Sequence, residues 1–283
     1  MVPVEYLLNF LKEDTPFGDI TSESVVPDVD CRAVITVEEP AVIAGVADAG
    51  VLFRHLGITV ECAAADGAPV ERGDVILTVS GNARKILTTE RTALNIIGRM
   101  SGVATMTRRF VSIVQNVRPG CRIAATRKTC PGFRLLDKKA VSLGGGDPHR
   151  WSLSDGILIK DNHLSFTSIP EAVAHARERS LYQRIEVEVS TVEDAMLAAR
   201  AGADIIMLDN MTPDAVGNVV KTLTREGLRD RVTIEVSGGI DEDTLARYAV
   251  CGTDVISIGA LTHSVRNISV HLDIVKTDPG KTQ

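Results

Sequence analysis

The sequence contains few aromatic residues: they make up 4% of its 283 residues, and there is a single tryptophan. The core must therefore be built from Ala, Val, Ile and Leu, and aliphatic, β-branched cores suit sheets that are buried on both faces. The five cysteines are scattered and form no CxxC pair, which argues against a zinc site and against a disulfide framework. We therefore expect a reduced, cytoplasmic protein.

Long apolar runs are also missing. No stretch approaches the roughly 20 residues that a membrane-spanning helix needs, and the first residues lack the pattern of a signal peptide. The net charge is −6, whereas a general nucleic-acid binder is usually basic. With 44% hydrophobic and 24% charged residues, the composition is that of an ordinary globular protein of one large or two medium domains.

Positive charge is nevertheless concentrated between residues 127 and 150. Against two aspartates, this stretch holds six basic residues: Arg127, Lys128, Arg134, Lys138, Lys139 and Arg150. In an acidic protein, such a cluster indicates a pocket for a small anion. Lys138 and Lys139 are the exception, because we expect them to lie on a solvated helix face.

The first 117 residues have the pattern of an α+β domain. Apolar spacing predicts a helix at 3–12, short strands between about 31 and 82, and a helix at 46–56. Residues 68–81 are predicted to be paired strands of a compact β-sandwich. From 85 to 117 the pattern is helical again, with a break predicted near Ser101 and Gly102.

After residue 118 the chain alternates between short apolar strands and helices. The predicted strands are 122–126, 156–160, 185–189, 204–208, 232–236 and 254–258. Thr191 and Asp241 are predicted caps of two of the helices. Such alternation predicts a parallel sheet, and six units suit an incomplete α/β barrel, with a doubly wound open sheet as the alternative. The expected domains are 1–117, 118–270 and a C-terminal tail, 271–283.

In a barrel, chemistry belongs at the C-terminal ends of the strands. Glycines after the last two predicted strands, in "EVSGGI" and "SIGALTHS", predict a phosphate site. Glu188 and Asp209 end neighbouring strands and suit a magnesium ion that keeps several waters. Cations there could surround a ligand with more than one carboxylate: Arg127, Lys128, His149, Arg150 and Lys160. The residues alone thus predict a two-domain α/β enzyme that binds a phosphorylated substrate, Mg²⁺ and a polycarboxylate.

At these residues the sequence resembles the quinolinate phosphoribosyltransferases, the carboxylating nicotinate-nucleotide pyrophosphorylases. The resemblance covers nearly the whole chain. It rests on motifs in the same order: "EDTPFGDIT" (13–21), "TERTALNIIGRMSGVAT" (89–105), "TRKTCPGFRLLDKKAVSLGGGDPHR" (126–150), "LIKDNH" (158–163), "EVEVST" (186–191), "MLDNM" (207–211), "IEVSGGI" (234–240) and "ISIGALTHS" (256–264).

The resemblance implies a Mg²⁺-dependent enzyme of NAD biosynthesis. This family joins quinolinate to phosphoribosyl pyrophosphate and releases pyrophosphate, carbon dioxide and nicotinate mononucleotide. Arg127, His149, Arg150 and Lys160 would hold quinolinate, together with Arg91 of a partner subunit. The assembly would be a homodimer or, as the alternative, a hexamer formed as a trimer of dimers. Lys128, Glu188 and Asp209 would serve the phosphoribosyl donor and its magnesium as catalytic residues. The 5′-phosphate end would be bound by Ser237, Gly238, Gly259 and His263.

Two positions depart from the family pattern. Pro148 stands before the His-Arg pair, where the family has Asn, and proline lacks a backbone donor. Support of His149 by its neighbours is therefore in question. Cys130 stands where Thr is commoner, a change that we interpret as one of packing.

Two other functions are compatible with parts of the sequence. One is a paralogous transferase of the molybdenum-transport-associated type, acting on another acceptor. The cation set argues against it, because a neutral acceptor would leave buried cations unpaired. The other is a lipoyl- or biotinyl-type carrier, which needs a lysine at a hairpin tip. Neither Gly73-Asp74 nor Gly81-Asn82 supplies one.

Overall fold

The computed structural model describes residues 2–275, which form two compact units. The first unit comprises 2–106, 135–144 and 265–275, and the second comprises 107–134 and 145–264. The domains expected from the sequence are contiguous, whereas these units alternate along the chain. One reason is that a single helix, α4 (Ala83–Val117), has residues in both.

The first unit is an antiparallel α+β domain. Its four-stranded sheet has the order β12-β1-β5-β3, and β2 pairs with β4 separately. The elements are α1 (Val4–Asp14), α2 (Ile20–Val25), β1 (Asp30–Val37), β2 (Ala41–Val42), α3 (Val46–His55), β3 (Thr59–Cys62), β4 (Pro69–Val70), β5 (Val75–Asn82), most of α4, most of α5 (Arg134–Leu143) and β12 (Val270–Val275).

The expected pairing within 68–81 is wrong. Strand β5 pairs with β1 on one side and β3 on the other, so β4 has no place beside it and pairs with β2. The expected C-terminal tail also begins inside a strand, because β12 pairs with β1 from Val37↔Val270 to Arg32↔Val275. The rest of that tail, 276–283, lies outside the described residues.

The break predicted near Ser101 and Gly102 is also wrong, because α4 is continuous there. A Cβ atom on Gly102 would lie 2.2 Å from the carbonyl oxygen of Arg266, and one on Gly98 would lie 2.9 Å from that of Ile268. These glycines allow the segment before β12 to approach the helix closely. Their role is packing, and the helix pays only the modest propensity cost of glycine.

The expectation of a solvated face for Lys138 and Lys139 is wrong as well. Lys138 is fully buried in α5. Lys139 Nζ lies 2.5 Å from Oδ2 of Asp48 and 3.5 Å from Oδ2 of Asp66. Both lysines therefore belong to the packing of the first unit, and the basic stretch is divided between structural cations and those near the site.

The second unit contains a six-stranded parallel sheet in the order β6-β11-β10-β9-β8-β7. Its elements are β6 (Arg122–Ala124), β7 (Ile157–Ile159), α6 (Asp161–Leu164), α7 (Ile169–Arg179), β8 (Ile185–Val189), α8 (Val192–Ala201), β9 (Ile205–Asp209), α9 (Pro213–Arg225), the 3₁₀ helix η1 (Arg229–Arg231), β10 (Thr233–Ser237), α10 (Glu242–Ala249), β11 (Val255–Ser257) and α11 (Ala260–His263).

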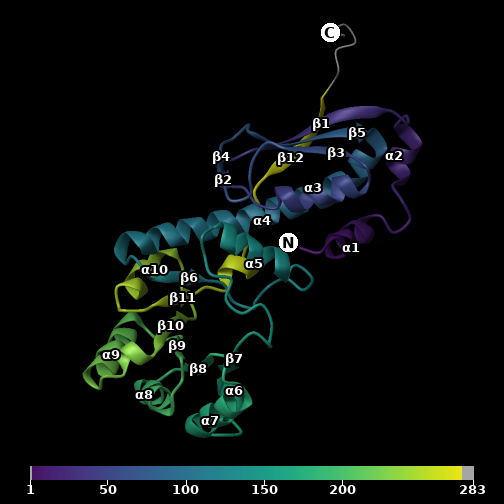
Figure 1. Ribbon diagram of the computed structural model, residues 1–283. Coiled ribbons are helices and arrows are strands. Elements are labelled where there is room, and N and C mark those ends of the chain that lie inside the picture. The colour runs from purple at the N-terminus through teal and green to yellow at the C-terminus, as the bar shows by residue number, and fades with distance from the viewer. Residues whose placement is uncertain (1, 276–283) are drawn as a thin grey trace. The chain divides into compact units, whose positions relative to one another are not determined.

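This order distinguishes the barrel from the doubly wound alternative. From β7 to β11 each strand lies beside its successor in the chain, and β6 follows β11, so the order never reverses as it does in a doubly wound sheet. Among the described strands, β6 and β7 are the two edges, which makes the barrel incomplete. Helices α7 to α10 follow the strands in turn on the outside of the curved sheet (Figure 1).

Local sequence signals explain several element boundaries. All six predicted strands of this unit are confirmed. The predicted caps are confirmed too: Thr191 Oγ1 accepts from the N–H of Asp194 at 3.1 Å, and Asp241 Oδ1 accepts from that of Thr244 at 3.0 Å.

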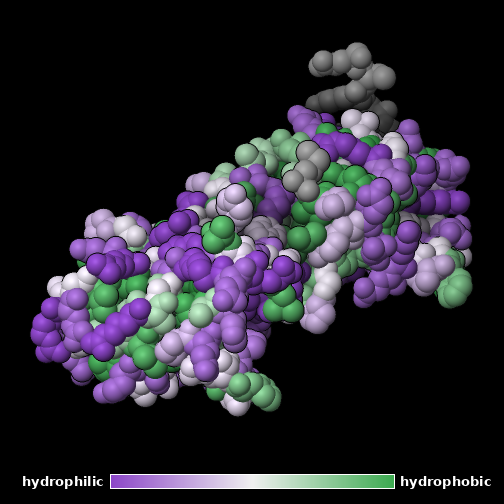
Figure 2. All heavy atoms as spheres, turned by 60° about the horizontal axis from the view of Figure 1, so that its bottom comes forward, coloured by the Kyte–Doolittle hydropathy of each residue, from purple (hydrophilic) through white to green (hydrophobic). Residues whose placement is uncertain are grey.

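Hydrophilic residues predominate on the face shown in Figure 2. Among residues 2–275, no helix has the length and apolar character needed to cross a bilayer.

Candidate active site

A cavity of about 460 Å³ opens at the C-terminal ends of the barrel strands. It is lined by most of the residues that the sequence singled out: Arg127, Lys128, His149, Arg150, Lys160, Glu188, Asp209, Ser237 and Gly238. They come from separate strands and from the loop before β7. Parallel strands bring their C-terminal ends to one edge, so residues far apart in the chain meet there.

The cations in the cavity are held close together. Nε of Arg127 is buried and has no hydrogen-bond partner among the described residues. Burial lowers the pKa of the Arg150 guanidinium, and the positive charge of Arg127 lowers it further, while Glu186 and Glu188 act in the opposite direction. Nζ of Lys160 is ion-paired with Oε2 of Glu188. An anionic ligand would reduce the repulsion between Arg127 and Arg150, and it would accept a hydrogen bond from Nε of Arg127.

The two expected metal-binding carboxylates end adjacent strands. Glu188 in β8 pairs in register with Met207 of β9, and Asp209 is the last residue of β9. Oδ2 of Asp209 accepts a hydrogen bond of 2.7 Å from the amide of Asn210. Carboxylate oxygens beside a wet cavity are the donors that Mg²⁺ uses when it keeps waters and substrate oxygens as its other ligands. The donor set therefore fits magnesium.

The loop after β10 has the backbone of an anion-binding turn. Gly238 and Gly239 have φ values of +96° and +61°, which favour glycine. A Cβ on Gly238 would lie 2.2 Å from Oδ1 of Asn210. Asn210 is itself left-handed, with φ of 53°, and its N–H donates to the carbonyl of Ser237 at 2.8 Å. The loop after β9, which contains Asn210, and the loop after β10 therefore hold each other in place.

The other residues expected at the phosphate end lie next to this cavity without lining it. A Cβ on Gly259 would lie 3.1 Å from the side chains of both His263 and Lys128. Oγ1 of Thr262 donates to the carbonyl of Lys128 at 2.9 Å. Helix α11, which follows β11, therefore supports the backbone of Lys128. Arg91 is an exposed residue of α4 in the first unit, and it does not line the cavity of this chain.

The segment that carries His149 answers the question raised by Pro148. The N–H of His149 donates to Oδ1 of Asp147 at 2.7 Å, and His149 is left-handed, with φ of 54°. Asp147 is itself joined to β6: its N–H donates to Ile123 at 2.7 Å, and its carbonyl accepts from Ala125 at 2.9 Å. Main-chain support therefore comes from Asp147. Cys130 is exposed and does not line the cavity.

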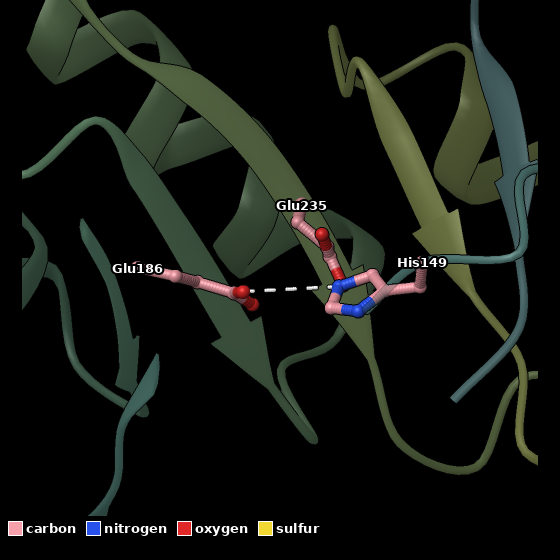
Figure 3. A group of neighbouring side chains, drawn as sticks. All are labelled: His149, Glu186 and Glu235. Carbon is pink, nitrogen blue, oxygen red and sulfur yellow. Dashed lines mark ion pairs between the residues drawn. The ribbon is translucent and has the colours of Figure 1, made fainter. Parts of the chain in front are cut away.

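Sequence reasoning missed two buried glutamates that point toward the ring of His149 (Figure 3). Nε2 of His149 is 3.3 Å from Oε1 of Glu235 and 3.7 Å from Oε2 of Glu186. The two residues are 2% and 4% exposed. Burial, and then the charge of Glu235, raise the pKa of Glu186 to about 7, although His149, Arg150 and Lys160 oppose the rise.

The sequence did contain a signal for these residues. Glu186 and Glu235 are charges within five-residue strands of the parallel sheet, where a buried charge is unexpected, and side chains two positions apart share a face. Glu186 therefore lies one layer below Glu188, inside the barrel. Both glutamates also line a second cavity of about 600 Å³, which lies toward the N-terminal ends of the strands and includes Arg122 and Arg184.

Comparison with known proteins agrees with this architecture. The family models for the C-terminal and N-terminal domains of quinolinate phosphoribosyl transferase match residues 103–273 and 19–101. A probable nicotinate-nucleotide pyrophosphorylase (carboxylating) from Archaeoglobus fulgidus is 44% identical over 261 residues, covering 92% of this chain and 100% of the relative. A similarly described protein from Bacillus subtilis is 41% identical over 95% of this chain and 92% of its own.

Solved structures show the same relationship. The nicotinate-nucleotide pyrophosphorylase of Francisella tularensis has a TM-score of 0.90 and 35% identity, covering 97% of this chain and 98% of that one. The enzyme from Ehrlichia chaffeensis has a TM-score of 0.91 and 32% identity, covering 97% and 99%. The chain therefore belongs to the quinolinate phosphoribosyl transferase family.

Proposed function

We propose that the protein is a nicotinate-nucleotide diphosphorylase (carboxylating) of NAD biosynthesis. It transfers a phosphoribosyl group from phosphoribosyl pyrophosphate to quinolinate and yields nicotinate mononucleotide, pyrophosphate and carbon dioxide. The observation that carries the proposal is a cavity in which a group of cations faces two carboxylates and a glycine turn. Such a cavity matches a dicarboxylate acceptor beside a phosphorylated donor.

In this proposal, Arg127, His149, Arg150 and Lys160 bind the two carboxylates of quinolinate. The unpaired Nε of Arg127 supports this assignment, because a buried donor without a partner costs free energy until a ligand accepts from it. Binding fixes the pyridine nitrogen near the ribosyl carbon, so positioning supplies much of the rate enhancement. No protein nucleophile and no covalent enzyme intermediate are required.

Lys128, Glu188 and Asp209 serve the phosphoribosyl donor. The ribosyl centre gains positive character as pyrophosphate leaves, and carboxylates fixed beside it stabilise that charge. Lys128 offers a compact cation for the departing pyrophosphate. Glu188 and Asp209 would hold Mg²⁺, which neutralises charge on the diphosphate when it is bound. Ser237 and Gly238 bind the 5′-phosphate, and Gly259 and His263 complete that end.

Decarboxylation then needs little from the protein. The ribosylated pyridine nitrogen is cationic, so the electron pair left when the adjacent carboxylate departs as carbon dioxide is stabilised by that charge. The cations of the cavity keep the ring aligned and away from bulk water while the carboxylate departs. A proton from solvent then takes its place on the ring carbon.

We also propose a homodimer in which a partner subunit donates its Arg91. The residue is exposed in α4 and absent from the cavity lining of its own chain, as a residue acting in a second copy would be. An Arg91→Ala chain and an Arg127→Ala chain, each weakly active, should then regain activity when mixed, because one hybrid site keeps both arginines. Mixing without any gain would contradict the shared site.

The direct test of the function supplies phosphoribosyl pyrophosphate and Mg²⁺ with either quinolinate or nicotinate. Nucleotide formation and release of carbon dioxide should occur with quinolinate only. Turnover of nicotinate without turnover of quinolinate would refute the substrate assignment. A covalent ribosyl adduct found after mixing the enzyme with the donor alone would refute direct transfer.

A further inference from the structure

His149 is held by its main chain in an uncommon conformation. A left-handed φ is unusual outside glycine and usually has a local hydrogen bond to stabilise it. Here the bond is the one that Oδ1 of Asp147 accepts from the N–H of His149, at 2.7 Å. The other oxygen, Oδ2, lies 2.9 Å from Nη2 of Arg122 in β6. Both carboxylate oxygens of Asp147 therefore have partners. They hold the main chain of His149 in place, and this sets the direction of its Cα–Cβ bond.

The imidazole ring is held from the other side. Its Nε2 points into the barrel, toward the carboxylates of Glu235 and Glu186 (Figure 3). Glu235 is fixed in turn, because the Oε1 atom nearest to His149 also accepts from the buried hydroxyl of Ser257. These groups come from β8, β10 and β11 of the parallel sheet, in which β10 pairs with β11 and β9 lies between β10 and β8. The ring is thus clamped by elements that no substrate needs to move.

The ring nitrogens of histidine are distinct, and the partner of one decides what the other presents. Since Nε2 faces the carboxylates of Glu235 and Glu186, the tautomer that is protonated at Nε2 fits this environment, and it leaves Nδ1 as the acceptor of the ring. Without the carboxylates of Glu235 and Glu186, the ring of His149 could rotate and turn either nitrogen toward the ligand. The same line of reasoning applies to histidines that bind metals, where such outer partners matter nearly as much as the ligands themselves.

We propose that Glu235 and Asp147 are positioning residues for quinolinate binding, acting on His149 from its ring and from its main chain. Glu186 assists Glu235 as a second carboxylate beside Nε2. This inference rests on the proposed function and deepens it, because it assigns part of the affinity for the dicarboxylate to residues that act through His149. Glu235 also lines the cavity itself, so its effect through His149 has to be tested separately.

The test compares Glu235→Gln with wild type in steady-state kinetics. KM for quinolinate should rise about tenfold, the loss expected for one hydrogen bond to a charged group. KM for phosphoribosyl pyrophosphate should stay unchanged. Glu226→Gln, in which a surface glutamate at the end of α9 is changed, is the matched control and should match wild type for both substrates. A rise in both KM values would mean general disorder of the barrel and would overturn the proposal.

A double-mutant cycle then asks whether Glu235 acts through His149. In a His149→Ala background, Glu235→Gln should have no further effect on KM for quinolinate, because the ring that it positions is gone. An undiminished tenfold effect in that background would overturn the proposal. Metal analysis of the purified protein gives a separate check: one zinc ion per chain, lost in Glu235→Gln, would make the cluster a metal site and overturn it too.

Asp147 provides a second variant in case Glu235→Gln folds poorly. Asp147→Asn keeps an oxygen that can accept from the N–H of His149, so its KM for quinolinate should stay within about threefold of wild type. Asp147→Ala removes the acceptor, and its KM should rise about tenfold. Equal behaviour of the two would overturn the main-chain role. Turnover by the wild type separates this proposal from the proposed function. If the wild type does not use quinolinate, the proposed function is refuted. If the wild type and all variants use quinolinate with the same KM, only the positioning role of Glu235 and Asp147 is refuted.

Discussion

Replacing Glu186 by Gln should change how the stability of the protein depends on pH. Glu186 is 4% exposed inside the barrel, and its Oε1 has no hydrogen-bond partner among the described residues. Its pKa is raised from 4.5 to about 7, first by burial and then by Glu235. The folded protein therefore binds this proton more tightly than the unfolded chain does. Between pH 4.5 and 7, the free energy of unfolding falls as pH rises.

The size of the effect follows from the shift. A pKa difference of one unit corresponds to about 1.4 kcal/mol, so a rise from 4.5 to about 7 corresponds to about 3 kcal/mol. Glutamine resembles the protonated carboxyl in shape and charge but does not ionise. Near pH 4.5, Glu186→Gln and wild type should therefore have similar stability. Above pH 7, the variant should be more stable than wild type by up to about 3 kcal/mol.

The assay is urea unfolding followed by circular dichroism at pH 4.5, 5.5, 6.5 and 7.5, with equal m values required of both proteins. Glu171→Gln is the control. Glu171 caps α7, and its bonds from Ser168 lower its pKa below 4.5, so its contribution is lost only below that pH and the difference between this variant and wild type should stay flat from pH 4.5 to 7.5. A stability difference for Glu186→Gln that stays flat, or shrinks as pH rises, would refute the reasoning about the buried carboxyl.

The sequence was sufficient for the barrel because its signals are local. Each strand is a short apolar run, bounded by turn residues or by a helix cap such as Thr191. Chain order then decides the sheet order, since neighbouring βα units pack beside each other. Once the strands are known, their C-terminal ends are known too. This is why the sequence alone places residues as distant as Arg127 and Asp209 at one end of the barrel, and both line the same cavity.

The errors share a physical cause, which is contact between residues far apart in the chain. Gly102 looked like a helix break, yet its missing Cβ makes room for the carbonyl of Arg266. Lys138 looked solvated because it is charged, but it is fully buried in α5. Strand β12 could not be recognised as a partner of β1, since some 230 residues separate them in the chain. Periodicity contains no information about such contacts.

The two layers of carboxylates within the barrel also show that a sequence pattern does not reveal contacts between distant residues. Glu188 is at the mouth, where water and Lys160 reach it, so its position fits the general rule for parallel strands. Glu186 is two residues earlier on the same face, and the rule argues against a charge there. The barrel tolerates it because His149 and Arg150 enter from a separate loop and oppose the cost of burial. That compensation comes from tertiary structure, so only the coordinates reveal it.

Two further predictions concern the site and the fold. Arg127→Ala should raise KM for quinolinate at least tenfold and leave KM for the phosphoribosyl donor almost unchanged. Asp209→Ala should instead impair the use of phosphoribosyl pyrophosphate. Steady-state kinetics with each substrate varied would contradict the assignment if both variants behaved as wild type. Gly102→Ala places a Cβ 2.2 Å from the carbonyl of Arg266, so it should destabilise the protein by about 1–3 kcal/mol in urea unfolding. Gly217→Ala, within α9, meets no atom within 4 Å and should instead stabilise it by about 1 kcal/mol through helix propensity. If the two alanines had the same effect, the close approach at Gly102 could not be what keeps a glycine in the middle of α4.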